Sequence, residues 1–195
     1  MAGRAVTKEE SVASEVYDPR IPTLAYRLKR IVIAESHYWW GLDHKPTTFF
    51  AQIHQESAWD PEAKSPYASG LAQFTPDTAE WISNLYPADL GENNPLDSRW
   101  AIRACIRYDR WLYEKASFAF DDDHRWRFLL SGYNGGWGNV LKDREFARMN
   151  GKYRDRWTCN VEHFSKRASS AFRENRNYVR RILDVFVPIY KKACF

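Results

Sequence analysis

The chain has 195 residues, of which 44% are hydrophobic and 28% are charged. This length and this balance are ordinary for one soluble globular domain with a core of its own. No stretch approaches the roughly 20 apolar residues that cross a bilayer, so we expect no stable membrane insertion. The formal net charge of +4 favours an anionic partner. Because no known nucleic-acid motif is present, we expect that partner not to be nucleic acid.

The first third of the chain predicts an arm followed by two helices. Residues 1–20 are polar and lack periodicity, which indicates a flexible arm. Pro22 then opens an amphipathic helix whose apolar residues recur at helical spacing. The next helix is expected to take Thr47 or Thr48 as its N-cap and to run to about Trp59.

The middle of the chain predicts a short β element and further helices. Residues 64–74 are rich in Ser, Pro and Gly, which indicates loops around a small β-ribbon. Residues 76–86 have a helical pattern, and Asp97 is placed to cap a long helix after it.

The last part predicts two more helices. The acidic run 121–123 is expected to cap the helix that follows, because three consecutive acids on a helix cannot face one metal ion. A Gly-rich turn is expected over 132–138, and a last helix from about Ser169 to Tyr190. The predicted fold class is therefore mainly α (α+β), with residues 21–195 as one domain.

The cysteines and the start of the chain bear on compartment and cofactors. Cys105, Cys159 and Cys194 cannot form an even disulfide framework, and reduced thiols are favoured over one bridge. No Cys or His spacing fits zinc, so we expect neither metal nor cofactor. The first residues lack the apolar core of a signal peptide, which predicts a cytoplasmic protein.

One acidic residue lies on the apolar face of the second helix. Phe49, Ile53 and Glu56 follow the four-then-three spacing of a single face. A carboxyl pressed against apolar groups has a raised pKa and can deliver a proton near neutral pH. A Glu that bends into solvent at the helix end is the alternative reading. For the neighbouring His54 we expect a structural role, since no Ser or Cys is placed for it to activate.

Three blocks of sequence resemble the soluble lytic transglycosylases, the SLT domain family related to goose-type lysozyme. The first is residues 56–61, Glu-Ser-Ala-Trp-Asp-Pro, continued by the Gly-Leu-Ala-Gln-Phe of 70–74. The second, Gly-Tyr-Asn-Gly-Gly at 132–136, resembles the Ala-Tyr-Asn-x-Gly signature of the family. The third, at 174–179, resembles its Glu-Thr-x-x-Tyr-Val signature. The blocks occur in family order and imply a single lysozyme-like domain with the β-ribbon beside the catalytic helix.

The resemblance implies a role for each matching residue. Glu56 matches the catalytic acid and base of the family. Ser65 matches a serine beside the reacting sugar, and Gln73 matches a glutamine that lines the cleft. Ser65 can also be read as a plain turn residue.

The second and third blocks supply the remaining candidates. Tyr133 and Asn134 match a pair that shapes the wall of the cleft near the acid. Glu174 and Tyr178 lie one helical turn apart and match a pair that closes the far side. Asn134 can alternatively be a turn residue and Glu174 a solvated helix acid.

The chain departs from the family pattern at three positions. Ala72 stands where relatives usually carry methionine, which removes a flexible apolar side chain from the expected cleft. Gly132 replaces an alanine, and Asn175 replaces a threonine. Neither of the last two is expected to touch the acid.

The resemblance implies cleavage of peptidoglycan glycan strands by one carboxyl, without a metal. Glu56 protonates the oxygen between MurNAc and GlcNAc and then takes the proton of the MurNAc 6-hydroxyl, which closes onto C1. The alternative on the same scaffold is a muramidase that admits water. A third hypothesis is a non-catalytic wall-binding or virion module. The only other nearby candidate for a second carboxyl, Asp60, lies beyond the expected helix end.

The context implied is that of a bacteriophage endolysin. A single domain without a signal peptide is expected to wait in the host cytoplasm as a monomer. A separate pore-forming protein would then release it to the cell wall in the periplasm. A virion-associated enzyme is the alternative.

Overall fold

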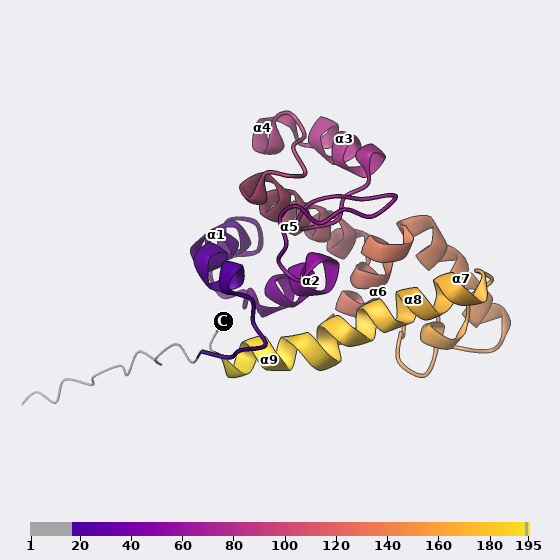
Figure 1. Cartoon of the computed structure of the whole chain (residues 1–195). Coiled ribbons are helices and arrows are strands. Elements are labelled where there is room, and N and C mark those ends of the chain that lie inside the picture. Colours follow the sequence, from indigo (N-terminus) through magenta and orange to yellow (C-terminus); the bar gives the residue numbers. More distant parts are fainter. Residues whose placement is uncertain (1–16, 194) are drawn as a thin grey trace, which may run out of the picture.

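The structure is a computed structural model that describes residues 17–193 and 195. It is built from helices joined by short loops (Figure 1). The helices are α1 (Thr23–Trp40), α2 (Thr47–Ser57), α3 (Pro76–Leu85), α4 (Pro87–Leu90), α5 (Ser98–Lys115), α6 (Asp122–Gly135), α7 (Trp137–Met149), the 3₁₀ turn η1 (Val161–His163), α8 (Ser169–Arg180), the π-helical turn η2 (Arg181–Phe186) and α9 (Val187–Lys192). The predicted fold class, mainly helical with a small β element, is confirmed.

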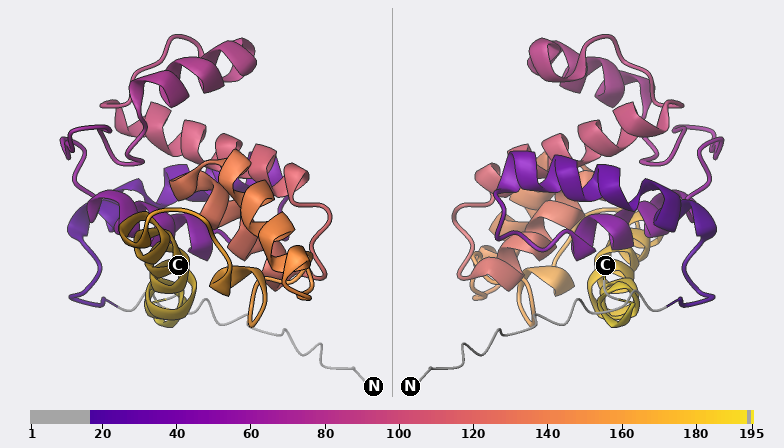
Figure 2. Two further views of the ribbon diagram at one scale, coloured as in Figure 1. Left: turned by 90° about the vertical axis from the view of Figure 1, so that its right-hand side faces the viewer. Right: turned by 90° about the vertical axis from the view of Figure 1, so that its left-hand side faces the viewer.

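The arrangement places α2 in the middle of the molecule. α5 packs against α1, α3 and α6, while α2 contacts α1, η2 and α9. The last three elements, α8, η2 and α9, continue into one another as a long helix along the base, viewed nearly end-on in Figure 2. α3 and α4 lie at the opposite end (Figure 2).

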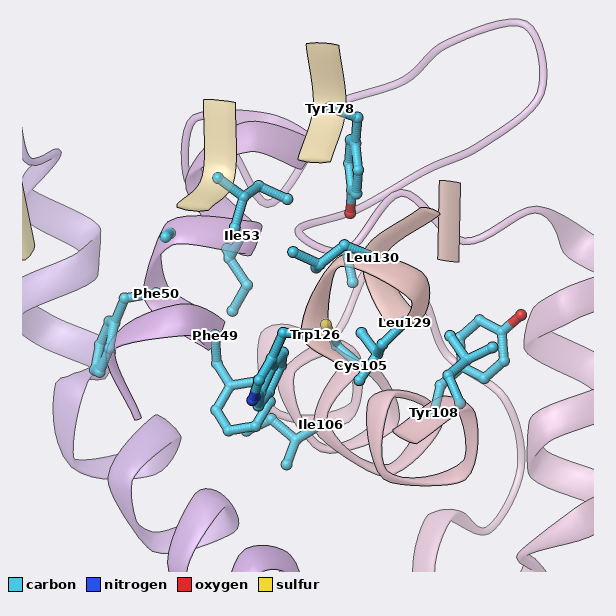
Figure 3. Packing of buried hydrophobic residues seen from close by; sticks show 14 of the residues in the cluster. Phe49, Phe50, Ile53, Cys105, Ile106, Tyr108, Trp126, Leu129, Leu130 and Tyr178 are labelled. Atoms are coloured by element: carbon cyan, nitrogen blue, oxygen red, sulfur yellow. The ribbon is translucent and has the colours of Figure 1, made fainter. Parts of the chain in front are cut away.

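The core forms where α2, α5 and α6 meet (Figure 3). Phe49 and Ile53 of α2 are fully buried, and the Phe49 ring meets the Trp126 ring of α6 edge-on, with centroids 5.8 Å apart. Each such side chain contributes about 1.5–3 kcal/mol by leaving water. Since the apolar face of α2 is fixed in this way, the direction of every side chain on α2 is fixed too.

Helix starts follow the predicted caps with one exception. Asp97 accepts a hydrogen bond from Trp100 N at 2.7 Å, and Asp121 accepts one from His124 N at 2.9 Å. The prediction for α2 was wrong, because its N-cap is Pro46 and no side chain caps it. The Thr47 hydroxyl instead donates to the carbonyl of Phe195 at 3.1 Å, tying α2 to the end of the chain.

The Gly-rich turn expected over 132–138 was also wrong. Helix α6 runs through Gly135, the break is at Gly136 with a φ of 80°, and α7 follows at once. Gly132 and Gly135 lie inside α6 and serve close packing, whereas Gly136 makes the break. A Cβ on Gly132 would lie 3.0 Å from the Trp137 ring, so only glycine lets α6 approach the start of α7 this closely.

The predicted last helix is confirmed and contains a local irregularity. Pro188 has no N–H and its ring crowds the carbonyl four residues earlier, which disfavours a regular α-helix. The residues just before the proline form the π-helical turn η2, in which each hydrogen bond spans five residues and closes a wider ring of backbone atoms. The long helix thereby continues to Lys192 without ending at Pro188.

Residues 1–16 of the expected arm lie outside the described part of the chain, and so does Cys194. Asp18 is buried, its N–H donates to the Tyr26 hydroxyl at 2.8 Å, and its carboxylate pairs with Arg20. Cys105 is a buried free thiol and Cys159 an exposed one. Among the described residues, no helix is both long and apolar enough to cross a membrane.

Candidate active site

A cleft of about 690 Å³ lies between the loop after α2 and the long C-terminal helix. The loop wall includes both small β-bridges, Lys64 with Ser69 and Ser69 with Phe74, in the segment predicted as a β-ribbon. All seven residues singled out in the sequence line this one cleft. They are Glu56, Ser65, Gln73, Tyr133, Asn134, Glu174 and Tyr178.

Glu56 is placed by the sharp end of α2. It lies in the last turn, and the two residues that follow the end of the helix, Ala58 and Trp59, have φ values of 50° and 65°. Left-handed backbone costs roughly 1–2 kcal/mol for a residue with a Cβ. The buried Trp59 indole, which donates to the Tyr190 hydroxyl at 2.7 Å, offsets that cost and fixes the reversal.

The surroundings of Glu56 keep its carboxyl protonated at neutral pH. Burial raises its pKa from 4.5 to about 8, the hydrogen bond from Tyr178 opposes the rise, and the charge of Glu174 adds to it. The Tyr178 hydroxyl donates to Oε1 of Glu56, and in Figure 3 it points away from its own helix into the interior. A carboxylic acid with such a pKa can act as a proton donor near pH 7.

Two tyrosines form the floor beside the acid. The rings of Tyr133 and Tyr178 are nearly parallel, with centroids 6.5 Å apart. The Tyr133 hydroxyl donates to the carbonyl of Ala72 at 2.9 Å. The Ala72 side chain is fully buried and is not among the residues that line the cleft. In this structure, position 72 therefore contributes its backbone to the site.

The loop wall holds itself through the predicted polar residues. The Ser65 hydroxyl accepts from the N–H of Ala68 at 3.0 Å, while Gln73 Nε2 donates to the carbonyls of Ala63 and Gly70 at 3.1 and 2.9 Å. Gln73 keeps this position with a φ of 45°. In this structure both side chains brace the loop, and no hydrogen bond joins either to Glu56.

On the other wall, Asn134 bonds directly to Glu174 and is held by the buried amide of Asn175. Asn134 Nδ2 donates to Glu174 Oε1 at 3.5 Å, and Asn134 Oδ1 accepts from Asn175 Nδ2 at 2.9 Å. Asn175 is almost fully buried and also exchanges hydrogen bonds with Ser131. The replacement of the usual threonine by Asn175 thus orients a cleft residue, although it does not touch the acid.

The sequence interpretation missed the charged cluster that supports this amide. Arg176 Nη1 donates to Asn175 Oδ1 at 2.7 Å, and both Arg167 and Arg176 bind the buried Asp143 carboxylate at 2.5 and 2.9 Å. Asp143 lies in α7, the helix that was not predicted. Its partners lie more than 20 residues away, so no local pattern indicates the cluster.

The alternative readings for two other residues are settled by their contacts. His54 stacks on Phe186 with ring centroids 4.2 Å apart, and its Nδ1 lies 3.0 Å from the Tyr190 hydroxyl, as expected for a structural histidine. Asp60 is exposed, accepts from Glu62 N at 2.9 Å, and does not line the cleft. Within the described residues, no group of three His, Cys, Asp or Glu side chains could hold a metal ion.

The site is thus a cleft with an aromatic floor around one carboxyl of raised pKa, in a mainly helical domain. The family model described as "Transglycosylase SLT domain" matches residues 32–155, which is well over half of the chain. The chain belongs to this family.

Named relatives agree with that assignment. The chain is 33% identical over 106 residues to the membrane-bound lytic murein transglycosylase F of Aeromonas hydrophila, which covers 54% of the chain and 20% of that protein. It is 35% identical over 105 residues to the protein of the same name from Marinobacter nauticus, covering 53% and 19%. The chain thus spans about a fifth of the length of these relatives.

A solved structure extends the likeness beyond the matched sequence. The 70 kDa soluble lytic transglycosylase SLT70 of Escherichia coli superposes with a TM-score of 0.59 at 26% identity. The superposition covers 88% of this chain and 25% of SLT70. The same protein has been solved in complex with bulgecin A, and that structure matches equally well.

Proposed function

We propose that residues 21–195 form a peptidoglycan lytic transglycosylase domain in which Glu56 is the catalytic acid and base. The observation that carries the proposal is the raised pKa of Glu56, about 8, in a cleft large enough for sugar rings. The names of the similar proteins, which are lytic transglycosylases, support the substrate class.

The proposed reaction uses one carboxyl twice. Glu56 gives its proton to the oxygen between MurNAc and GlcNAc as that bond breaks, and GlcNAc leaves with a free 4-hydroxyl. The 2-acetamido group of the substrate stabilises the cationic C1 of MurNAc. The ionised Glu56 then takes the proton of the MurNAc 6-hydroxyl while its oxygen bonds to C1. The product is 1,6-anhydro-MurNAc, and the acid is restored.

The other cleft residues are assigned supporting roles in this proposal. Tyr178 holds the Glu56 carboxyl by its hydrogen bond, and Tyr133 supplies the apolar floor beside it. Asn134 and Glu174 present polar groups to the sugar, and the loop wall that Ser65 and Gln73 brace closes the cleft on the other side.

Mass spectrometry of digested peptidoglycan tests the reaction type. Intramolecular closure adds no water, so each product should be about 18 Da lighter than the hydrolytic one by formula arithmetic and should resist borohydride. Hydrolytic products of full mass with a reducing MurNAc end would mean that the alternative, a muramidase, is correct. Absence of any cleavage on a cell-wall gel would favour a non-catalytic module.

For the biological setting we propose the endolysin context. It comprises a monomer, storage in the host cytoplasm and release by a separate pore-forming protein, with a virion-borne enzyme as the alternative. The test is expression in a bacterium, with lysis expected only after the membrane is permeabilised. Lysis of cells whose membranes are intact would contradict this setting.

A further inference from the structure

Charge is distributed unevenly over the cleft. With Glu56 protonated, the charged side chains among those that line it are Glu174, Arg180 and Arg181. All three belong to the long C-terminal helix, and the loop wall opposite presents hydroxyl, amide and apolar side chains. The cleft therefore has one charged wall and one neutral wall.

The two arginines line the same cleft as the acid and retain free donors. Arg181 Nε donates to Gln55 Oε1 at 2.7 Å, and Gln55 directly precedes Glu56. No ion pair to Arg180 or Arg181 is found in the part of the chain that the structure describes. A guanidinium has five N–H donors, so most of those on Arg181 remain available to a ligand.

The order of groups along the helix gives the wall a direction. Tyr178 contacts Glu56, Glu174 lies one turn before it, and Arg181 lies one turn after it, about 5 Å along the axis. Arg181 is also the first residue of the π-helical turn, a distortion that often occurs at functional sites. The cations are thus confined to one side of the acid and the anion to the other.

The chemistry of peptidoglycan indicates what such cations would bind. The sugars within the strand carry hydroxyl and N-acetyl groups, which are uncharged. The carboxylates belong to the peptide stem, which is joined to the lactyl group of MurNAc, the sugar that reacts at Glu56. Guanidinium groups bind carboxylates through paired charge-assisted hydrogen bonds.

We propose that Arg180 and Arg181 form a subsite for a carboxylate of the peptide stem on the reacting MurNAc. The inference rests on the proposed function and deepens it, because it makes the enzyme selective for strands that carry peptides. The same positive wall disfavours strands whose stems have been amidated.

The test measures kcat/KM of several protein variants on several forms of the substrate. The proteins are wild type, Arg180→Gln, Arg181→Gln, the double variant, and Arg173→Gln as a matched control. Arg173 is exposed on the same helix and does not line the cleft. The substrates are peptide-bearing strands, the same strands with stem carboxylates converted to amides, and amidase-trimmed strands that keep only the lactyl carboxylate.

In the wild type, amidation of the stems should lower kcat/KM about tenfold, the usual effect of losing a charge-assisted contact. In the double variant the same amidation should change kcat/KM by less than about twofold, since the contact is already lost. In Arg173→Gln, amidation should lower kcat/KM by the same factor as in the wild type. If amidation of the stems lowers kcat/KM by the same factor in wild type and in the double variant, the subsite is wrong. If the wild type cleaves trimmed strands with a higher kcat/KM than peptide-bearing strands, and the double variant loses that advantage, the arginines bind the free lactyl carboxylate instead, because this carboxyl is amide-bonded in peptide-bearing strands.

Binding measurements separate this proposal from the activity. If the wild type forms no anhydro ends on any strand, the proposed function fails. Calorimetry with soluble peptide-bearing muropeptides then decides the subsite independently. Tighter binding of the native than of the amidated muropeptide by wild type, but not by the double variant, supports it, and equal binding refutes it.

Discussion

Glu56→Gln changes the proposed acid with the least structural disturbance. Glutamine keeps the size of the side chain and can still accept a hydrogen bond from Tyr178, but it cannot donate a proton as a carboxylic acid does. Because general acid–base catalysis contributes about 10²- to 10⁴-fold, the rate of anhydro-MurNAc formation should fall at least a hundredfold. A folded variant, checked by circular dichroism, that cleaves at near wild-type rate would remove Glu56 from the mechanism.

Tyr178→Phe tests the hydrogen bond that moderates the acid. That bond favours the ionised carboxylate and lowers the pKa of Glu56 against the larger effect of burial. The wild-type kcat/KM should decline above a pH of about 8, where Glu56 loses its proton in the free enzyme. In the variant this alkaline limb should move to higher pH, because the ionised form has lost a donor. A limb that stays in place or moves down contradicts the assignment.

For single residues, the sequence predicted which side chains lie in the site better than it predicted their hydrogen-bond partners. The spacing of Phe49, Ile53 and Glu56 predicted a carboxyl held on an apolar face, and the structure places it there with a raised pKa. The family motifs indicated the other candidates, and all of them line the cleft. The bracing of the loop by Gln73 depends on its left-handed backbone, and no pattern of residue types reports a φ angle.

At the scale of elements, the loop after α2 depends on one close approach. Gly70 has a φ of 76°, and a Cβ there would lie 1.8 Å from the carbonyl oxygen of Pro95. Gly70→Ala should therefore displace the loop and cost about 3 kcal/mol of unfolding free energy, by combining backbone strain with overpacking. Activity should fall with it, since the Gly70 carbonyl accepts from Gln73.

Gly91→Ala is the matched control for that prediction. Gly91 also has a positive φ, 62°, but no atom lies within 4 Å of the added Cβ. It should show the backbone cost alone, about 1 kcal/mol in urea denaturation, with activity retained. Equal effects of the two substitutions would mean that the Pro95 contact does not hold the loop.

Helix positions could be predicted where local chemistry sets them. Asp97 and Asp121 were identified as caps because a short acidic side chain before a periodic segment has few other roles. α7 was missed because the glycines before it indicate a turn when read locally. Gly132 instead packs against Trp137 and Gly135 against Arg167, and such contacts between elements cannot be recognised from the local sequence.

At the scale of the whole molecule, the fold stabilises a site that is costly to form. Asp109 on α5 is fully buried, accepts from Gln52 at 3.2 Å, and burial raises its pKa well above the ordinary value. The charge of Glu56, when ionised, raises the pKa of Asp109 further. The core around α2 and α5 supplies the free energy that keeps both groups in place.

This arrangement predicts that the protein loses stability as the pH rises. For Glu56 the folded pKa of about 8 exceeds the ordinary 4.5, so the folded state binds more protons between these values. The stabilisation is complete below about pH 4.5 and is lost as the pH rises to about 8. At pH 7 the cost of keeping Glu56 in its site is about 3 kcal/mol.

Urea denaturation of wild type and Glu56→Gln at several pH values measures this cost. The variant should be more stable than wild type by about 3 kcal/mol at pH 7 and by less than about 0.5 kcal/mol at pH 4.5, where the folded wild-type carboxyl is protonated and the unfolded one is half protonated. Asp109→Asn should likewise reduce the slope of stability against pH. At the acid end, the lowered pKa of Asp18, about 2, acts in the opposite direction, so the comparison belongs above pH 4.5. Wild-type stability that is flat or rising from pH 5 to pH 8, with no gain in Glu56→Gln, would contradict the buried protonated acid on which the proposed chemistry depends.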